Sequence, residues 1–307
     1  MGIYLAIDGG GTKTSCVIGN ENSVLGTGAS SGSNVLRVSE HQARQAIETA
    51  VQLACAEARI SPRSIDRTCI GVAGGARPDA AAAIRQILAD LVSGQIEVVG
   101  DMVIAMEASA GSGPGVVVIA GTGSIAYGRN SAGQTARAGG WGFAISDEGS
   151  GFWIGRKAVS AAMRAFDEGR ASMLIESTMH SWRLNSREQL IVAANGATQP
   201  DFAALLSSVI AAAEFDDPVA HDVLAEAGAE LAGLAKIVIR RIFTKGDTVP
   251  VAMSGGVFRN SALVRKVFYN NLRLDFPNAA VNSEVIDPVQ GALQLARRGA
   301  ELQPAEL

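Results

Sequence analysis

Two stretches of this chain share one pattern, in which a strand-like run enters a glycine-rich turn and a second strand-like run leaves it. The first is IYLAIDGGGTKTSCVI, residues 3–18, and the second is VVIAGTGSIAY, residues 117–127. Apolar and β-branched residues on both sides of such a turn are typical of neighbouring strands. Because the unit occurs near the start and again near the middle, the sequence predicts two halves that begin with the same topology.

Predicted strands alternate with predicted helices along the chain. In the first half, the capping box formed by Ser39 and Gln42 predicts the start of a helix over 40–59. Short apolar runs at 67–72 and 95–99 are typical of buried strands. This alternation favours the α/β class, with a sheet that is partly parallel.

The boundary between the halves is expected in the run Gly-Ser-Gly-Pro-Gly at 111–115, because these residues form turns. The length of 307 residues fits about two domains, which we place at 1–113 and 114–307. Residues 155–243 are expected to be mostly helical. Asp287 and Pro288 begin a last helix, which is a candidate to pack back on the N-terminal domain. A cleft between the domains is the expected ligand site.

Composition argues against several classes of function. The net charge of −4 gives no basic surface for nucleic acid, and no apolar run reaches the ~20 residues of a membrane helix. The chain enters a strand at once, without the basic segment of a signal peptide, so a cytoplasmic location is expected. The three cysteines and three histidines are scattered, which argues against a disulfide framework and a zinc site. We therefore expect no nucleic-acid partner and no membrane partner.

Both glycine-rich turns have the chemistry of anion sites. Successive main-chain N–H groups in a tight turn favour phosphate, and glycine lets the phosphate approach the backbone. Thr12, Thr122 and Ser124 add hydroxyl donors, and Asp8, just before the first turn, is a candidate to hold Mg²⁺ through water. Neither turn matches the Walker or Rossmann motif, because both lead into a strand. Ordinary hairpins, in which Gly, Thr and Ser are common, are the alternative interpretation.

A third pattern, AGGWGFAISDEGSGFWIGRKA at 138–158, is too rich in glycine to form a helix before about Ser150. It combines Trp141 and Trp153 with the acidic pair Asp147 and Glu148. A loop that presents backbone groups, carboxylates and an indole suits a ligand with many hydroxyls, which need paired donors and acceptors. The alternative is a hinge between domains that contains a buried tryptophan.

Four stretches together, IDGGGTKT, IAGTGS, MSGG and GGWG…SDEGSGFWIG, resemble the N-acetylglucosamine kinases of the BadF/BadG/BcrA/BcrD ATPase family. That family lies within the sugar kinase–hsp70–actin superfamily. The resemblance covers nearly the whole chain in the right order, and the last stretch is the most specific of the four. It implies two ribonuclease H-like, or actin-like ATPase, domains with an interdomain cleft.

The resemblance also implies a role for each residue that matches a family position. Asp101, at the end of the strand EVVGDM, matches the catalytic carboxylate, which would accept the proton of the sugar 6-hydroxyl. The implied ATP-binding residues are Gly10, Gly11, Thr12, Thr122 and Gly255. The implied sugar-binding residues are Asn34, Asp101, Ser124, Gly140, Trp141, Gly142 and Asp147. Gly74 departs from the family, because some relatives carry a hydroxyl residue there.

The implied activity is transfer of the γ-phosphate of ATP, with Mg²⁺, to the 6-hydroxyl of N-acetylglucosamine or glucosamine. The choice between these sugars, N-acetylmuramate and another hexose stays open, and a homodimer is a candidate assembly. One alternative is an ATPase activator of an acyl-CoA reductase or dehydratase. Such activators hold an iron–sulfur cluster with paired cysteines, whereas Cys16, Cys55 and Cys69 lie in runs typical of the core. The other alternative is a non-catalytic, sugar-sensing regulator, which would ordinarily carry a separate DNA-binding segment.

Overall fold

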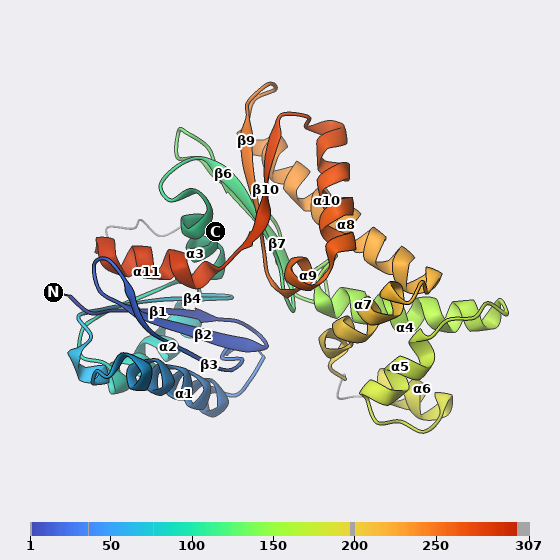
Figure 1. Cartoon of the computed structure of the whole chain (residues 1–307), viewed down its shortest axis with the longest axis horizontal. Helices are drawn as coiled ribbons and strands as arrows, with labels where there is room; N and C mark the ends of the chain where they lie inside the picture. The colour runs from blue at the N-terminus through green and yellow to red at the C-terminus, as the bar shows by residue number, and fades with distance from the viewer. Residues whose placement is uncertain (1, 36, 76, 197–199, 300–307) are drawn as a thin grey trace. The chain divides into compact units, whose positions relative to one another are not determined.

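The computed structural model describes residues 2–35, 37–75, 77–196 and 200–299 (Figure 1). The chain forms two compact units. The first contains the chain up to Val117, residues 129–135 and the chain from Ile286 onward, and the second contains residues 118–128 and 136–285. No helix in the described ranges is both long enough and apolar enough to cross a membrane.

The first unit is built on a five-stranded sheet with the order β3-β2-β1-β4-β5. The strands are β1 (Tyr4–Gly9), β2 (Lys13–Gly19), β3 (Val24–Ser31), β4 (Arg67–Val72) and β5 (Gln95–Gly100). β1, β2 and β3 pair antiparallel, whereas β4 pairs parallel with both β1 and β5. The predicted strands at 67–72 and 95–99 are therefore confirmed as β4 and β5.

Helices cover both faces of this sheet, as Figure 1 shows. They are α1 (Glu40–Ala58), α2 (Pro78–Leu91), α3 (Asp101–Ala110) and α11 (Pro288–Arg298). The alternation of side chains along β1 explains the two layers. Leu5 and Ile7 pack in one core cluster with residues of α1 and α2, whereas Ala6 packs in another with Ile104 of α3 and with α11. The sheet is thus buried on both sides.

The start of α1 is fixed by the capping box that the sequence predicts. Gln42 N donates to the Ser39 hydroxyl at 3.3 Å, and Ser39 N donates to Gln42 Oε1 at 3.0 Å. These two bonds satisfy main-chain donors that the first turn of a helix otherwise leaves free. The predicted helix over 40–59 is confirmed within one residue at its end.

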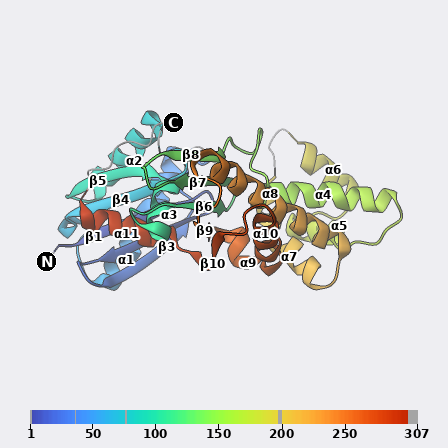
Figure 2. The ribbon, with the colours of Figure 1, turned by 90° about the horizontal axis from the view of Figure 1, so that it is seen from above.

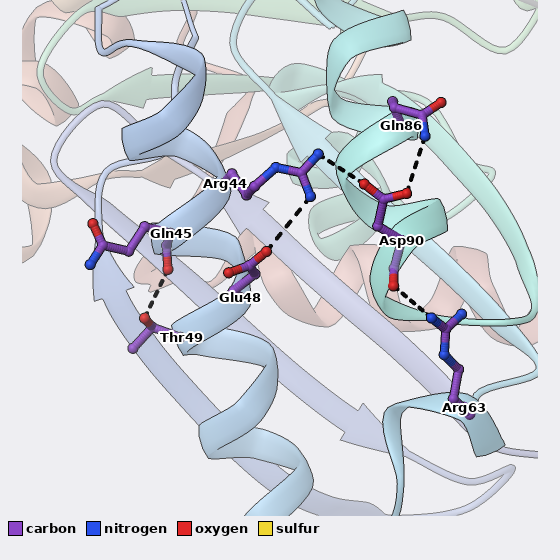
Figure 3. Close-up of polar contacts among 7 residues, drawn as sticks. All are labelled: Arg44, Gln45, Glu48, Thr49, Arg63, Gln86 and Asp90. Carbon is purple, nitrogen blue, oxygen red and sulfur yellow. Dashed lines mark hydrogen bonds and ion pairs between the residues drawn. The ribbon is translucent and has the colours of Figure 1, made fainter.

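Polar side chains link α1 and α2 with the 3₁₀ turn Pro62–Ser64 (Figure 3). Arg44 lies 2.9 Å from the Asp90 carboxylate and 3.7 Å from Glu48. Gln86 donates to the Asp90 carboxylate, and Arg63 donates to the Asp90 carbonyl at 2.7 Å. Partly exposed ion pairs contribute only about 0–1 kcal/mol each. The apolar core beneath these side chains therefore holds the two helices in place.

The second sheet has the order β10-β9-β6-β7-β8. Its strands are β6 (Gly115–Ala120), β7 (Ser124–Arg129), β8 (Thr135–Gly139), β9 (Val249–Ser254) and β10 (Ala279–Ile286). When the strands of each sheet are counted in chain order, both sheets read third, second, first, fourth, fifth. The predicted repetition of one topology is therefore confirmed, since both sheets begin with a strand, a glycine-rich turn and a neighbouring strand.

Most of the remaining chain in the second unit is helical, as predicted for 155–243. The helices are α4 (Gly151–Asp167), α5 (Leu174–Ser181), α6 (Arg187–Asn195), α7 (Leu206–Glu214), α8 (Pro218–Ile242), α9 (Gly256–Asn260) and α10 (Ala262–Asp275). The long helix α8 packs against α4, α7 and α10. Figures 1 and 2 both show α5 and α6 at the end of this unit far from its sheet.

Candidate functional site

The strand ends of the first sheet bring the first glycine-rich turn and Asp101 to one edge. In the parallel ladders, Gly9 at the end of β1 pairs with Val72 at the end of β4, and Val72 pairs with Gly100 at the end of β5. The turn follows β1 directly and Asp101 follows β5 directly. The carboxyl ends of parallel strands are the edge where open α/β sheets bind ligands.

The first turn is a tight hairpin between β1 and β2. Gly10 N donates to the Lys13 carbonyl at 3.0 Å, which leaves Gly11 and Thr12 at the tip. Asp8 lies within β1, opposite Ser15 of β2 and Gly71 of β4, and is partly exposed. The predicted magnesium residue and the predicted phosphate residues therefore belong to one short stretch of the edge.

Asn34 lies beside this turn, because the segment after β3 is bonded to it. Ser33 N donates to the Gly10 carbonyl at 3.1 Å. Asn34 itself is only 7% exposed, and its carbonyl accepts the main-chain N–H groups of Arg37 and Val38. The structure thus brings the predicted sugar residue Asn34 to the same edge as the predicted phosphate residues.

Asp101 is the first residue of α3 and is partly buried. Desolvation by burial raises the pKa of its carboxyl group, and the hydrogen bond from Met102 N to Asp101 Oδ1, 2.9 Å long, offsets part of that rise. A raised pKa makes this carboxylate a better proton acceptor than an exposed aspartate. The chemistry of a general base is therefore present at this edge.

The second glycine-rich turn joins β6 to β7 and is bonded to the start of α4. Gly121 N donates to the Gly123 carbonyl at 2.9 Å, and the Gly121 carbonyl accepts Gly151 N at 2.8 Å. Phe152 N donates to the carbonyl of Thr122 at 3.3 Å. The buried hydroxyl of Ser124 donates to the Glu148 carbonyl at 2.7 Å. Ser124 thus ties the turn to the acidic loop, and its contact with a sugar stays a prediction.

The loop from Gly139 to Ser150 is held to the same turn at two further points. Gly140 N donates to the Ser124 carbonyl at 2.9 Å, and Ser124 N donates to Asp147 Oδ1 at 3.3 Å. Asp147 is buried and has a φ of 71°, a left-handed conformation that a residue other than glycine seldom adopts. Gly142 and Trp141 lie between these two points, so four of the predicted sugar residues of this unit share one loop, and the fifth, Ser124, is bonded to it.

Trp141 is the most accessible aromatic group of this loop. Its side chain is 59% exposed, and the Arg137 guanidinium lies 4.2 Å from the centre of its ring. Phe143 instead turns back toward the protein, with its ring 4.9 Å from that of Phe152. An exposed indole held by a cation–π contact offers an apolar face to a sugar ring.

Gly255, predicted to lie against the adenosine, begins the short helix α9 after β9. Its φ of 98° and its close approach to the backbone of Ala120 leave no room for a side chain. Ala120 is the last residue of β6, just before the second turn. The structure therefore brings the MSGG turn and the IAGTGS turn into contact within the second unit.

The described residues contain no group of three or more His, Cys, Asp or Glu side chains that could hold a metal ion by themselves. Mg²⁺ needs no such group, because it usually keeps several waters and binds one or two carboxylates together with phosphate oxygens. A carboxylate beside a turn that is predicted to bind phosphate, as at Asp8, fits that donor set.

The predicted site residues form two sets. Within the first unit lie Asp8, Gly10, Gly11, Thr12, Asn34 and Asp101, and within the second lie Thr122, Ser124, Gly140, Trp141, Gly142, Asp147 and Gly255. Sequence reasoning missed Thr14 and Ser33, whose buried hydroxyls bond to each other beside the first turn. The only signal in the sequence is the serine-rich run before Asn34, which by itself is typical of a loop.

Comparison with known proteins gives relatives over nearly the whole chain. An N-acetylmuramic acid/N-acetylglucosamine kinase of Clostridium acetobutylicum is 33% identical over 97% of this chain and 99% of its own length. An N-acetyl-D-glucosamine kinase of Dictyostelium discoideum is 28% identical over 96% of this chain and 97% of its own.

A putative N-acetylglucosamine kinase from Chromobacterium violaceum has a similar structure, with a TM-score of 0.76 and 23% identity over 96% of this chain and 98% of its own. This similarity and the repeated strand order identify the fold as two ribonuclease H-like domains, as predicted. A profile of the BadF/BadG/BcrA/BcrD ATPase family matches residues 5–296. The chain belongs to the BadF/BadG/BcrA/BcrD ATPase family.

Proposed function

We propose that this protein is a sugar kinase, which transfers the γ-phosphate of ATP to the 6-hydroxyl of N-acetylglucosamine or glucosamine. The main support for the proposal is the set of residues that lie at one edge of the first sheet. There a glycine-rich turn follows β1, Asn34 follows β3, and Asp101, whose carboxyl group has a raised pKa, follows β5. The kinase names of the curated relatives support the same reaction.

In this scheme Asp101 is the general base. The sugar hydroxyl oxygen forms a bond to the γ-phosphorus as the bond from that phosphorus to the bridging oxygen of ADP breaks. The hydroxyl proton passes to the Asp101 carboxylate, and ADP leaves with the electron pair of the broken bond. Such a base contributes about 10²–10⁴-fold to the rate, and a pKa raised toward the working pH favours the proton transfer.

The two glycine-rich turns hold the nucleotide. The backbone N–H of Gly11 and the hydroxyl of Thr12 bind phosphate oxygens, and Thr122 does so from the second turn. Gly10, whose own N–H is bonded to the Lys13 carbonyl, contributes by letting the phosphate approach the backbone. Gly255, which has no side chain, lies against the adenosine. When bound, Mg²⁺ neutralises charge on the β- and γ-phosphates, and Asp8 would hold it through water.

Asn34, Trp141 and Asp147 bind the sugar, together with Ser124 and the backbone at Gly140 and Gly142. A site that devotes buried polar groups to particular hydroxyls strongly rejects a sugar that lacks them. The name of one curated relative includes N-acetylmuramic acid and the name of the other does not, so this sugar belongs in the test panel. We also propose a cytoplasmic location and a homodimer.

The cysteines argue against the activator of an acyl-CoA reductase or dehydratase. Cys16, Cys55 and Cys69 are all buried and free of disulfides. Desolvation raises the pKa of the thiols of Cys16 and Cys69, which disfavours the thiolate form that ligates iron. A regulator without catalysis would bind the sugar yet release no ADP.

A coupled assay of ADP release tests the proposal on a panel of N-acetylglucosamine, glucosamine, N-acetylmuramic acid and glucose. We expect sugar-dependent ADP release with one of the first two, and none from Asp101→Asn. Asp79→Asn is the matched control, because Asp79 is the acidic residue in the first turn of α2, as Asp101 is in α3. Folded protein that releases no ADP with any sugar would refute the proposed function, and an active Asp101→Asn would remove Asp101 as the base.

A further inference from the structure

Two buried hydroxyl groups beside the first glycine-rich turn have no part in the scheme above. Thr14 lies in β2 and Ser33 follows β3, and both are completely buried. Their side-chain oxygens share a hydrogen bond of 2.8 Å, and Thr14 Oγ1 also donates to the Ser31 carbonyl at 2.7 Å. Gly9 leaves the space for this arrangement, since a Cβ at Gly9 would lie 2.9 Å from Ser33 Oγ.

This pair connects the turn with Asn34. Ser33 is fixed to the turn region by its side chain, through Thr14, and by its main chain, through the bond of 3.1 Å from Ser33 N to the Gly10 carbonyl. Asn34 is the next residue, and its own carbonyl accepts Arg37 N at 2.8 Å. The position of Asn34 therefore depends on the hydroxyls of Thr14 and Ser33, which fix the residue before it, and on the backbone turn that follows it.

We propose that Thr14 and Ser33 are a positioning pair, which sets Asn34 relative to the phosphate-binding turn. The inference rests on the proposed function, in which the turn holds phosphate and Asn34 holds the sugar. A fixed relation between the two matters because a misplacement of about 1 Å between reacting groups can cost about 10²-fold in rate. Thr14 and Ser33 touch neither substrate and act through Asn34.

Loss of the pair changes the sugar side of the reaction more than the nucleotide side. The turn itself stays anchored in the sheet, because Gly9 pairs with Thr14 in the ladder of β1 and β2. The segment that leads to Asn34 instead loses its side-chain anchor. Thr14→Val keeps the shape of the side chain and removes both of its hydrogen bonds, the one with Ser33 Oγ and the one to the Ser31 carbonyl. We expect the sugar KM to rise at least about tenfold, since each buried hydrogen bond is worth up to about that factor, and the ATP KM to change less than about twofold.

Thr14→Ser and Thr68→Val are the matched variants. Thr14→Ser keeps a hydroxyl and restores the sugar KM toward the wild-type value. Thr68 is a buried threonine on β4 of the same sheet, and its hydroxyl has no hydrogen-bond partner among the residues that the structure describes. Thr68→Val therefore makes the same chemical change without removing a bond, and it leaves both KM values as they are.

The experiment measures both KM values, the melting temperature and the affinity for N-acetylglucosamine by calorimetry with a non-hydrolysable ATP analogue present. A Thr14→Val enzyme with an unchanged sugar KM, or with equal losses for sugar and ATP, overturns the proposal. So does a variant in which only the melting temperature falls, because that result shows a purely structural role. If Thr14→Val does not fold, Ser33→Ala is measured with the same expectations.

A wild-type protein that neither binds a sugar nor transfers phosphate overturns both the proposed function and the positioning pair. A wild-type protein that phosphorylates the sugar, together with a Thr14→Val variant that matches it, overturns the positioning pair alone.

Discussion

A turn can contain glycine because the fold requires it or because a ligand must approach the backbone, and replacement of Gly121 by alanine distinguishes these two reasons. Gly121 lies in the second turn, between β6 and β7. A Cβ at this position would meet no atom within 4 Å, and the φ of Gly121 lies outside the left-handed region. The fold therefore does not require glycine here. Gly121→Ala should leave the free energy of unfolding unchanged or raise it by about 0.4–1 kcal/mol, the usual gain at a compatible site.

The proposed contact of a phosphate with the backbone of this turn, in contrast, requires glycine. A methyl group on Gly121 would displace a phosphate oxygen from the backbone, at the cost of about one charge-assisted hydrogen bond, or ~1.5–3 kcal/mol. That loss corresponds to a KM for ATP that is roughly 10- to 150-fold higher. We expect the change in the KM for ATP and not in that for the sugar. The main chain of Gly121 is bonded to Gly123 and Gly151, whereas the loop that is proposed to bind the sugar is bonded to Ser124.

The assay pairs urea unfolding with the ATP KM at saturating sugar. Gly233→Ala is the matched control, since a Cβ at Gly233 of α8 also meets nothing within 4 Å. This control should be as stable as the wild type or more so, and it should keep the wild-type ATP KM. A stable Gly121→Ala with an unchanged ATP KM would refute the role of the second turn in phosphate binding.

Two further results follow from charged groups of the first unit. Because burial raises the pKa of Asp101, whose carboxylate is the proposed base, we expect kcat/KM to fall as the pH is lowered through that pKa, which lies above the ~3.9 of an ordinary aspartate. The same shift makes Asp101 contribute stability at low pH that is lost as the pH rises through its folded pKa. Asp101→Asn should therefore flatten this part of the pH–stability profile. Arg298 of α11 forms an ion pair with Glu107, a buried residue of α3. Arg298→Ala leaves that carboxylate without its partner, and we expect urea unfolding to show a free energy of unfolding lower by about 2–3 kcal/mol. This is less than the roughly 3–5 kcal/mol of a fully buried pair, because Arg298 is half exposed. A decrease under about 0.5 kcal/mol would contradict a role of this pair in holding α11.

Local patterns were sufficient to predict the elements that carry strong periodic or capping signals. The helix α1 followed from its capping box, and the start of α4 followed from the glycines that exclude a helix before Ser150, which is the N-cap in the structure. The repeated strand–turn–strand unit predicted the common order of the two sheets. These signals depend on residues that are close together in the sequence.

The helix α3 and the strand β3 were not predicted, because their sequences can be interpreted only when the elements that pack against them are known. The sequence of α3, DMVIAMEASA, shows no single apolar face, because four successive residues, Ile104 to Glu107, are buried against other elements. The sequence of the edge strand β3, VLGTGASS, resembles a turn because it contains Gly26 and Gly28. In the structure these glycines let the backbone of α1 approach the strand closely. Both features require knowledge of which helix lies against which strand.

The candidate site divides in the same way. Glycine-rich turns and a carboxylate at a strand end can be recognised in the sequence itself, so the residues from Asp8 to Thr12 and Asp101 could be proposed from it. The bond between Thr14 and Ser33 depends on the pairing of β2 with β3, which places residues 19 positions apart side by side. The three hydrogen bonds that hold the acidic loop to Ser124 likewise join residues that are distant in the sequence.

The central claim is that this chain moves a phosphoryl group from ATP to a sugar. The most direct test is to incubate the pure protein with ATP, Mg²⁺ and N-acetylglucosamine or glucosamine and to identify the products by phosphorus NMR. We expect one equivalent of a sugar 6-phosphate for each equivalent of ADP. ADP formed at the same rate without sugar, or ADP formed without any sugar phosphate, would contradict it.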